Sequence, residues 1–101
     1  MHDVIVLYNL PNDTEAFDAH YRGTHAPLVD ALPNLREFAW GKVDDPTSAG
    51  YYLMARMTFR DPAEAAESMA SPAGQATVAD LANFAQAGVT VLNVARNESR
   101  R

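Results

Sequence analysis

The chain contains no cysteine among its 101 residues. It therefore has no disulfide, no thiolate nucleophile and no iron–sulfur cluster, and it cannot form the cysteine-based zinc sites. Positive charge is also scarce, because 8 basic residues stand against 13 acidic ones and the formal net charge is −5. No basic stripe is present, so we expect neither nucleic acid nor an anionic membrane as a partner.

Long apolar runs are missing as well. The longest, at residues 4–7 and 89–92, have the length of a strand, and the N-terminus lacks the basic flank and apolar stretch of a signal peptide. We therefore expect a cytoplasmic protein. Phosphate-binding glycine loops, Ser/His/Asp arrangements and dinucleotide fingerprints are absent too, so catalysis is expected to be acid–base or cofactor-assisted.

What is present is an ordinary globular composition, 48% apolar and 21% charged, in a chain long enough for one domain. Residues 4–8 are apolar and mostly β-branched, which predicts a buried first strand. Asn12 followed by Glu15 predicts a helix start, and an apolar helical pattern then extends to about Pro33. Alternating patterns at residues 35–43 and 51–59, joined by a turn-rich segment, predict two antiparallel strands.

The second helical region is expected to be broken in two, because Asp61-Pro62 and Ser71-Pro72 are both typical helix starts. Gly88 then precedes a final strand at residues 89–94. The order β-α-β-β-α-β predicts an α+β, ferredoxin-like fold, with a four-stranded antiparallel sheet and two helices on one face. The other face is left bare, which favours a homodimer. We assign residues 1–96 to this domain and 97–101 to a C-terminal tail.

His25 is the main candidate for chemistry. Phe17, Tyr21, His25 and Leu28 fall on one helical stripe, so the His25 imidazole faces the core with apolar neighbours. A neutral imidazole there can take a proton from a substrate and return it. The alternative is a buried histidine hydrogen-bonded to a backbone carbonyl, such as that of Gly23.

Pro27 disturbs the same helix, because it cannot donate to the Gly23 carbonyl. The helix either kinks at this point or restarts with Thr24 as a cap. In the second case His25 lies at a helix N-terminus, which disfavours its charged form.

A metal site at this pair of histidines is not expected. His20 and His25 are five residues apart, which on a regular helix separates their side chains by more than about a quarter-turn. No Asp or Glu nearby completes a set of ligands. Aromatic residues such as Tyr8 and Trp40 provide the walls of an apolar pocket, or they simply pack in the core.

The segments 17–29, 32–36 and 80–84 resemble the EthD family, and the resemblance covers essentially the whole chain. One departure is Asn34, where the family usually has glycine; asparagine tolerates the same left-handed backbone. The resemblance implies a dimeric α+β barrel. The family is named for a protein associated with bacterial degradation of an ether fuel additive, and related domains are grouped as oxidoreductases or lactone isomerases. Its characteristic polar residue falls on His25, with Tyr21 and Thr24 as pocket neighbours.

Our hypothesis is a metal-free catabolic or biosynthetic enzyme of the oxidoreductase or isomerase type, without a cofactor. Its substrate is an apolar cyclic or aromatic compound, and His25 is the general acid and base. The expected substrate pocket consists of Tyr21, Thr24, Phe17, Tyr8 and Trp40. One alternative is a non-catalytic protein that carries a hydrophobic metabolite for a partner oxygenase. Another is haem binding or degradation, with His25 or His20 as the axial ligand.

Overall fold

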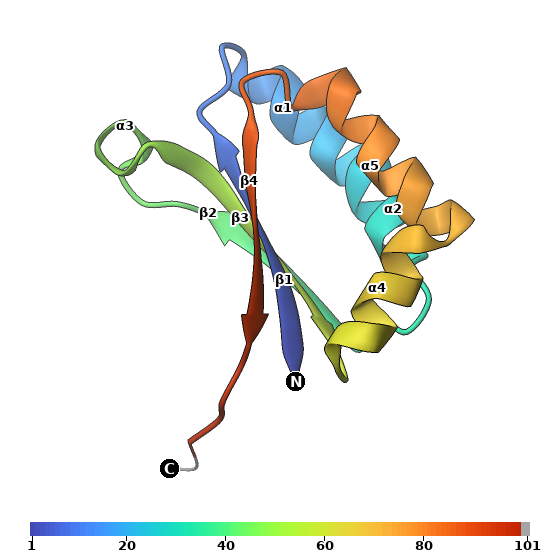
Figure 1. Cartoon of the computed structure of the whole chain (residues 1–101). Helices are drawn as coiled ribbons and strands as arrows, with labels where there is room; N and C mark the ends of the chain where they lie inside the picture. Colours follow the sequence, from blue (N-terminus) through green and yellow to red (C-terminus); the bar gives the residue numbers. More distant parts are fainter. Residues whose placement is uncertain (100–101) are drawn as a thin grey trace.

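The computed structural model describes residues 1–99 as one antiparallel sheet with all its long helices on one side (Figure 1). In chain order the elements are β1 (His2–Asn9), α1 (Thr14–His20), η1 (Tyr21–His25), α2 (Ala26–Asp30), β2 (Glu37–Lys42), α3 (Pro46–Ala49), β3 (Tyr51–Phe59), α4 (Pro62–Ala70), α5 (Pro72–Phe84) and β4 (Val89–Ala95). The molecule measures 36 × 35 × 18 Å, so it is a thin two-layered slab.

The strand order in the sheet is β2-β3-β1-β4, and every neighbouring pair is antiparallel. Two strands that are adjacent in sequence, β2 and β3, form a hairpin, whereas β1 lies between β3 and β4. This is the ferredoxin-like arrangement, and it confirms the fold predicted from the strand and helix order. The last strand, β4, forms one free edge of the sheet.

The core lies between the sheet and the helices. Val4, Val6 and Tyr8 alternate along β1 and are buried, because every second side chain of a strand points to the same face. On that face Val4 pairs with Met57 and Val6 with Ala55. Each fully buried aliphatic or aromatic side chain of this kind contributes roughly 1.5–3 kcal/mol to stability.

The starts of the helices agree only in part with the sequence patterns. The expected cap at Asn12 is wrong, because Asp13 occupies the cap and accepts a hydrogen bond from the Ala16 N–H at 3.0 Å. The break in the second helical region is confirmed, since Asp61 and Ser71 cap α4 and α5. The short helix α3 was not predicted; it lies within the turn-rich segment between β2 and β3.

The outer face of the sheet carries partly exposed apolar side chains. Met54, Leu92 and Val94 are 36%, 44% and 37% exposed. Near one end of this face Asp3 is buried, and it binds the Thr58 hydroxyl and the Arg96 guanidinium, each at 2.8 Å. Residues 97–99 of the expected tail belong to no helix or strand, and residues 100–101 lie outside the described part of the chain.

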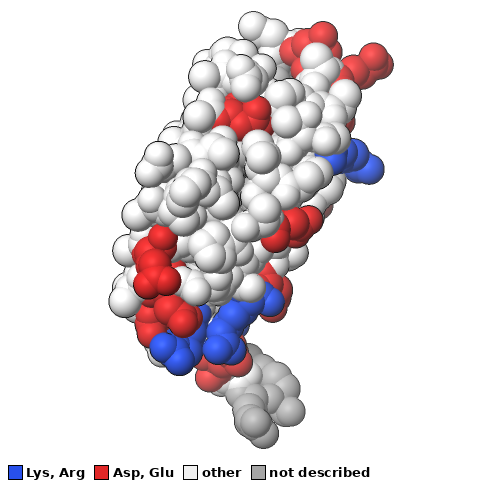
Figure 2. All heavy atoms as spheres, turned by 90° about the vertical axis from the view of Figure 1, so that its right-hand side faces the viewer, with Lys and Arg blue, Asp and Glu red and all other residues white. Residues whose placement is uncertain are grey.

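Figure 2 views the helical layer from outside. Most of this face is neither acidic nor basic, and the Lys and Arg side chains form no continuous stripe across it. No helix within residues 1–99 is both long enough and apolar enough to span a membrane.

Candidate functional site

The first helical segment places His20 and His25 on the same side. His25 ends η1, a π-type turn in which the Ala26 N–H donates to the carbonyl of Tyr21, five residues earlier. In this geometry five residues complete roughly one turn, so side chains five residues apart lie on the same side of the helix. In an α-helix, side chains with this spacing point in different directions. Pro27, which has no N–H to donate, follows directly. The π turn therefore aligns two histidines that a regular helix would separate.

The chain does not restart at Pro27. His25 and Ala26 both have right-handed helical backbone angles, and no side chain caps α2. The backbone widens into the π turn instead of breaking, and Thr24 is an ordinary exposed residue within it. The argument that a helix N-terminus acts on His25 therefore does not apply.

Asp80 joins the two histidines. It lies on the buried side of α5, where the Nε2 atom of His20 is 2.9 Å from both of its carboxylate oxygens. The Nδ1 atom of His25 is 2.9 Å from Oδ2 of the same carboxylate. The amide of Asn83, one helical turn further along α5, donates to Oδ1 at 3.0 Å. One buried carboxylate thus accepts hydrogen bonds from three side chains.

These contacts determine which groups carry charge. Burial by itself would raise the pKa of Asp80, but hydrogen bonds from Asn83, His20 and His25 outweigh it and lower that pKa below its ordinary range. Burial lowers the pKa of His25, although the hydrogen bond and the charge of Asp80 oppose this effect. An ionised carboxylate only accepts hydrogen bonds, so Nδ1 of His25 carries the proton and Nε2 is left as a base.

Nε2 of His25 lies 3.3 Å from the hydroxyl of Tyr8. Burial raises the pKa of Tyr8, and the Asp80 charge raises it further, so Tyr8 keeps its proton and donates it. Burial likewise raises the pKa of Tyr21, whose hydroxyl has no hydrogen-bond partner within the described residues. Two protonated tyrosines therefore line the same cavity as His25, and the Tyr8 hydroxyl contacts its basic nitrogen.

Tyr8, Tyr21 and His25 line a cavity of about 120 Å³ between the sheet and the helices, which we call the inner cavity. The rest of its wall is almost entirely apolar and includes Val4, Val6, Val29, Ala55, Met57 and Leu81. Two wall residues, Val78 of α5 and Val91 of β4, are 53% and 51% exposed. The inner cavity thus reaches the surface between α5 and the free edge strand.

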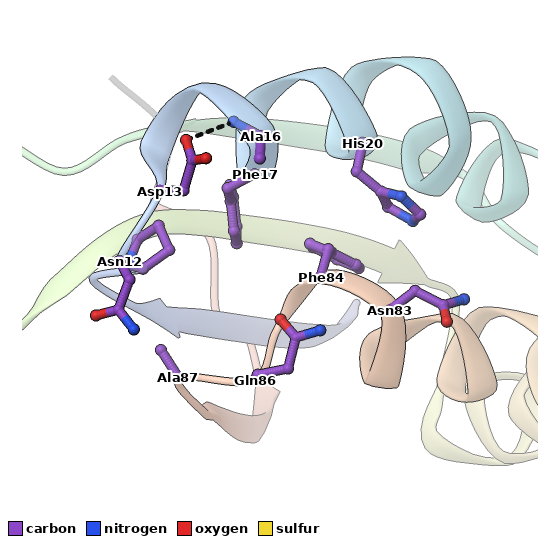
Figure 3. A pocket seen from close by; sticks show the side chains of 10 residues that line it. Asn12, Asp13, Ala16, Phe17, His20, Asn83, Phe84, Gln86 and Ala87 are labelled. Atoms are coloured by element: carbon purple, nitrogen blue, oxygen red, sulfur yellow. Dashed lines mark hydrogen bonds between the residues drawn. The ribbon is translucent and has the colours of Figure 1, made fainter.

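A second, outer cavity of about 540 Å³ lies between the start of α1 and the end of α5. Figure 3 shows His20 extending from its helix toward Phe84 and Asn83. Asn12, Asp13 and Gln86 contribute further polar groups to the wall of this cavity. His20 has 27% of its side chain exposed, so its imidazole contacts both the solvent side and Asp80.

The structure brings together three of the six residues expected at the site. His25, Tyr21 and Tyr8 share the inner cavity. Phe17 is buried in the core and lines the outer cavity. Trp40 lines neither cavity but packs against the Tyr21 ring, with centroids 5.0 Å apart.

Thr24, the sixth residue, is exposed and lines neither cavity. The side chains around the inner cavity lie on the helical side of the sheet. The bare outer face, on which the expectation of a dimer rests, contributes none of them.

Sequence analysis did not identify Asp80 as part of the site. It is separated from His20 and His25 by 60 and 55 positions, so no local spacing connects them. The only available signal was the position of an acidic residue on the apolar side of a helix, next to Leu81 and Phe84. Sequence analysis also placed His20 and His25 on different sides of the helix, because it assumed regular spacing.

No group of three or more His, Cys, Asp or Glu side chains within residues 1–99 is placed to hold a metal ion. His20 and His25 direct nitrogens at Asp80, and these atoms form hydrogen bonds with it. The described contacts of the two histidines are therefore hydrogen bonds to a carboxylate, as in an acid–base network.

Comparison with known proteins relates the whole chain to one family. The model of the EthD domain matches residues 11–88. An 11.0 kDa protein of Rhodococcus erythropolis, from the thcB-thcC intergenic region, is 47% identical over 96 residues, which cover 91% of each chain.

Solved structures agree with this relationship. An EthD family protein from Bacillus halodurans has a TM-score of 0.90 and 31% identity, covering 96% of this chain and 99% of its own. A dimeric ferredoxin-like protein from Thermobifida fusca has a TM-score of 0.73 at 16% identity, covering 94% and 90%, and shows only that the fold is shared. Because the family model matches residues 11–88 and relatives of 47% and 31% identity cover more than nine-tenths of the chain, the chain belongs to the EthD family.

Proposed function

We propose that this protein is a metal-free enzyme that acts on a small apolar cyclic or aromatic compound, with His25 as general acid and base. The observation that carries the proposal is the position of the His25 ring. Its Nδ1 is held by the Asp80 carboxylate at 2.9 Å, and its Nε2 faces Tyr8 at the wall of an apolar cavity. A base needs this arrangement, in which one nitrogen is held in place and the other carries no proton, so that it can take one from a substrate.

The chemistry best suited to these groups is proton transfer next to a carbonyl. His25 removes a proton from carbon through Nε2, and the Asp80 carboxylate stabilises the resulting imidazolium. Tyr8 and Tyr21 donate hydrogen bonds to the oxygen on which negative charge develops. His25 then returns the proton to another carbon, which balances an isomerisation without any further reactant. General acid–base catalysis of this kind contributes roughly 10²- to 10⁴-fold in rate.

Oxidation is the other reaction class associated with the family resemblance. The same proton removal would begin it, but the electrons would then need an oxidant in addition to these side chains. Isomerisation is therefore the reaction that we propose.

The inner cavity limits the substrate. Its volume of about 120 Å³ is similar to that of a cavity of about 150 Å³ known to bind benzene, which favours a ring of about six atoms. Apolar walls select against charged molecules, and the three polar groups at one end orient a single oxygen atom. Entry between Val78 and Val91 brings the substrate in along β4.

We also propose that the protein is a cytoplasmic homodimer. The partly exposed apolar side chains on the outer sheet face support this, because a second copy would remove them from water. The inner cavity lies on the other side of the sheet, so each chain would have its own site.

The test uses cyclohexanone and γ-butyrolactone as probes in D₂O. We expect the wild-type protein to catalyse the exchange of hydrogens next to the carbonyl, measured by NMR. His25→Gln should lower the rate by about 10²- to 10⁴-fold. Asp30→Asn, an exposed change in α2, is the control and should leave the rate unchanged.

Binding of the same probes is measured in parallel by chemical-shift titration. Bound probes that do not exchange faster with wild-type protein than with His25→Gln would show a carrier and contradict the proposed enzyme. If neither probe is bound, the proposed substrate class is wrong.

A further inference from the structure

The inner and outer cavities lie on opposite sides of one carboxylate. His25 lines the inner cavity, His20 lines the outer one, and Asp80 is in direct contact with both rings. We propose that His20 and Asp80 form a proton relay that connects His25 to water in the outer cavity. This inference rests on the proposed acid–base role of His25 and adds His20 as a residue that acts through Asp80.

The chain of contacts is continuous. From the outer cavity it runs from His20 Nε2 to Asp80 over 2.9 Å, and from Asp80 Oδ2 to His25 Nδ1 over 2.9 Å. From His25 Nε2 it continues to the Tyr8 hydroxyl over 3.3 Å. The first two distances are those of strong, charge-assisted hydrogen bonds, through which protons move readily.

The burial of the groups fits a path from solvent to core. The side chains of His25, Asp80 and His20 are 3%, 7% and 27% exposed, in the order of the path. His20 also stacks on the Phe84 ring, at 4.9 Å between centroids, which holds its imidazole in place. Only the residue at the outer end of the relay reaches water.

The π turn is the feature that makes this path possible. With a regular helix between the two histidines, only one of them could direct a ring nitrogen at Asp80. Such turns weaken a helix, because they replace its ordinary hydrogen bonds, and they occur frequently at functional sites. A histidine that merely fixed the position of Asp80 would duplicate the hydrogen bond that Asn83 already donates.

A relay gives His25 a second route for proton exchange with water when a bound substrate blocks the first. The opening of the inner cavity between Val78 and Val91 is also the entry for the substrate. While the substrate fills it, a proton on His25 has no direct contact with water. The outer cavity lies on the far side of Asp80 and stays open.

One proton enters the relay and one leaves it. His25 takes a proton at Nε2 and passes its Nδ1 proton to Asp80 Oδ2. At rest His20 donates to Asp80 through Nε2, so it first exchanges that proton for one on Nδ1 at the outer cavity. The Asp80 carboxyl group can then pass a proton to Nε2 of His20. His20 then releases its Nδ1 proton to water.

The test measures exchange of the His25 Nδ1 proton with water, by saturation-transfer NMR on the full chain labelled with ¹⁵N-histidine. His20→Gln is the decisive variant, because glutamine still donates a hydrogen bond to Asp80 but cannot pass on a proton. We expect exchange to slow by about tenfold or more in His20→Gln and in His20→Phe. Gln86→Ala is the matched control, since Gln86 lines the outer cavity but contacts none of the relay groups.

Exchange at the wild-type rate in His20→Gln would overturn the relay, because His20 would then only orient Asp80. If the variants do not fold, the wild-type protein still gives an answer. Exchange of the His25 Nδ1 proton should persist when cyclohexanone fills the inner cavity, and exchange that stops on binding would overturn the relay. This exchange measurement does not require turnover. A failure of the relay is therefore distinct from a failure of the proposed function, which would appear as full activity of His25→Gln.

Discussion

At the scale of single residues, the site depends on a balance around His25. Burial pushes the imidazole toward its neutral form, whereas the Asp80 carboxylate stabilises the charged form. Burial prevails, so the pKa of His25 lies below its ordinary value of 6.5. A positive charge on His20 lowers the pKa of His25 further. Tyr8 and Tyr21 are neutral. The ring is therefore a base at neutral pH, with a counter-ion ready for the proton.

Replacing the counter-ion tests this balance. Asp80→Asn removes the hydrogen bond and the charge that raise the pKa of His25, so we expect that pKa to fall further. The measurement is a pH titration of the His25 ring nitrogens by NMR. Asp30→Asn removes an exposed negative charge from the same helical segment and should hardly move the pKa of His25. An unchanged or higher pKa in Asp80→Asn would contradict the assignment of Asp80 as the partner.

The same shift makes stability depend on pH. Below the ordinary pKa of 6.5 the unfolded chain binds a proton at His25 that the folded protein does not bind. The contribution of His25 to the free energy of unfolding is therefore complete above that pH and decreases as the pH falls. The decrease between pH 7 and pH 5, measured by urea unfolding, should be steeper in Asp80→Asn than in the wild-type protein.

At the scale of helices, two glycines show how closely the elements pack. Gly74 lies in the first turn of α5, where an added Cβ would lie less than 3.0 Å from the Ser68 and Met69 carbonyl oxygens of α4 and would overlap with them. Gly23 lies in η1, and a Cβ there would meet nothing within 4 Å. The sharp turn from α4 to α5 thus requires glycine, and the π turn does not.

We expect Gly74→Ala to destabilise the protein by about 1–3 kcal/mol, because backbone atoms cannot move aside as a flexible side chain can. Gly23→Ala is the matched control and should stabilise the protein by about 0.5–1 kcal/mol, since alanine favours helix. Both values come from chemical unfolding followed by circular dichroism. Equal effects of the two substitutions would mean that the packing at Gly74 is not as tight as described.

At the scale of the whole molecule, the bare sheet face determines the expected assembly. Leu92 is 44% exposed on this face, in the edge strand β4, where it pairs with Ile5 of β1. Leu92→Asp would place a charge there, and burying that charge against a second copy is costly. We expect this variant to be a monomer in light-scattering measurements, whereas the wild-type protein should have the mass of two chains.

Leu10→Asp is the control for that experiment. Leu10 is 41% exposed in the loop after β1, outside the sheet, so its substitution should leave the mass of two chains unchanged. A wild-type protein that has the mass of one chain would remove the basis for the homodimer. That result would leave the inner cavity as described, because its wall residues lie on the helical side of the sheet, away from the bare face.

Local patterns in the sequence were sufficient for the fold. Alternation along β1, proline after the capping residues Asp61 and Ser71, and the order of the six elements each depend on neighbours in the chain, and the structure agrees with them. The left-handed backbone expected at Asn34 is present, with φ of 65°. Hydrophobic burial and backbone sterics act through such local patterns, so they can be recognised without coordinates.

Tertiary structure alone decided the chemistry of the site. His25 was selected from its helical stripe and from a family resemblance, but its partner Asp80 is 55 positions away. The side of the helix on which His20 lies depended on a π turn, whereas the sequence pattern assumed regular spacing. Contacts between distant elements and departures from regular geometry arise when the chain packs together. The sequence therefore determined the fold and the basic residue, and only the packing of α5 against the first helical segment supplied its carboxylate and its second histidine.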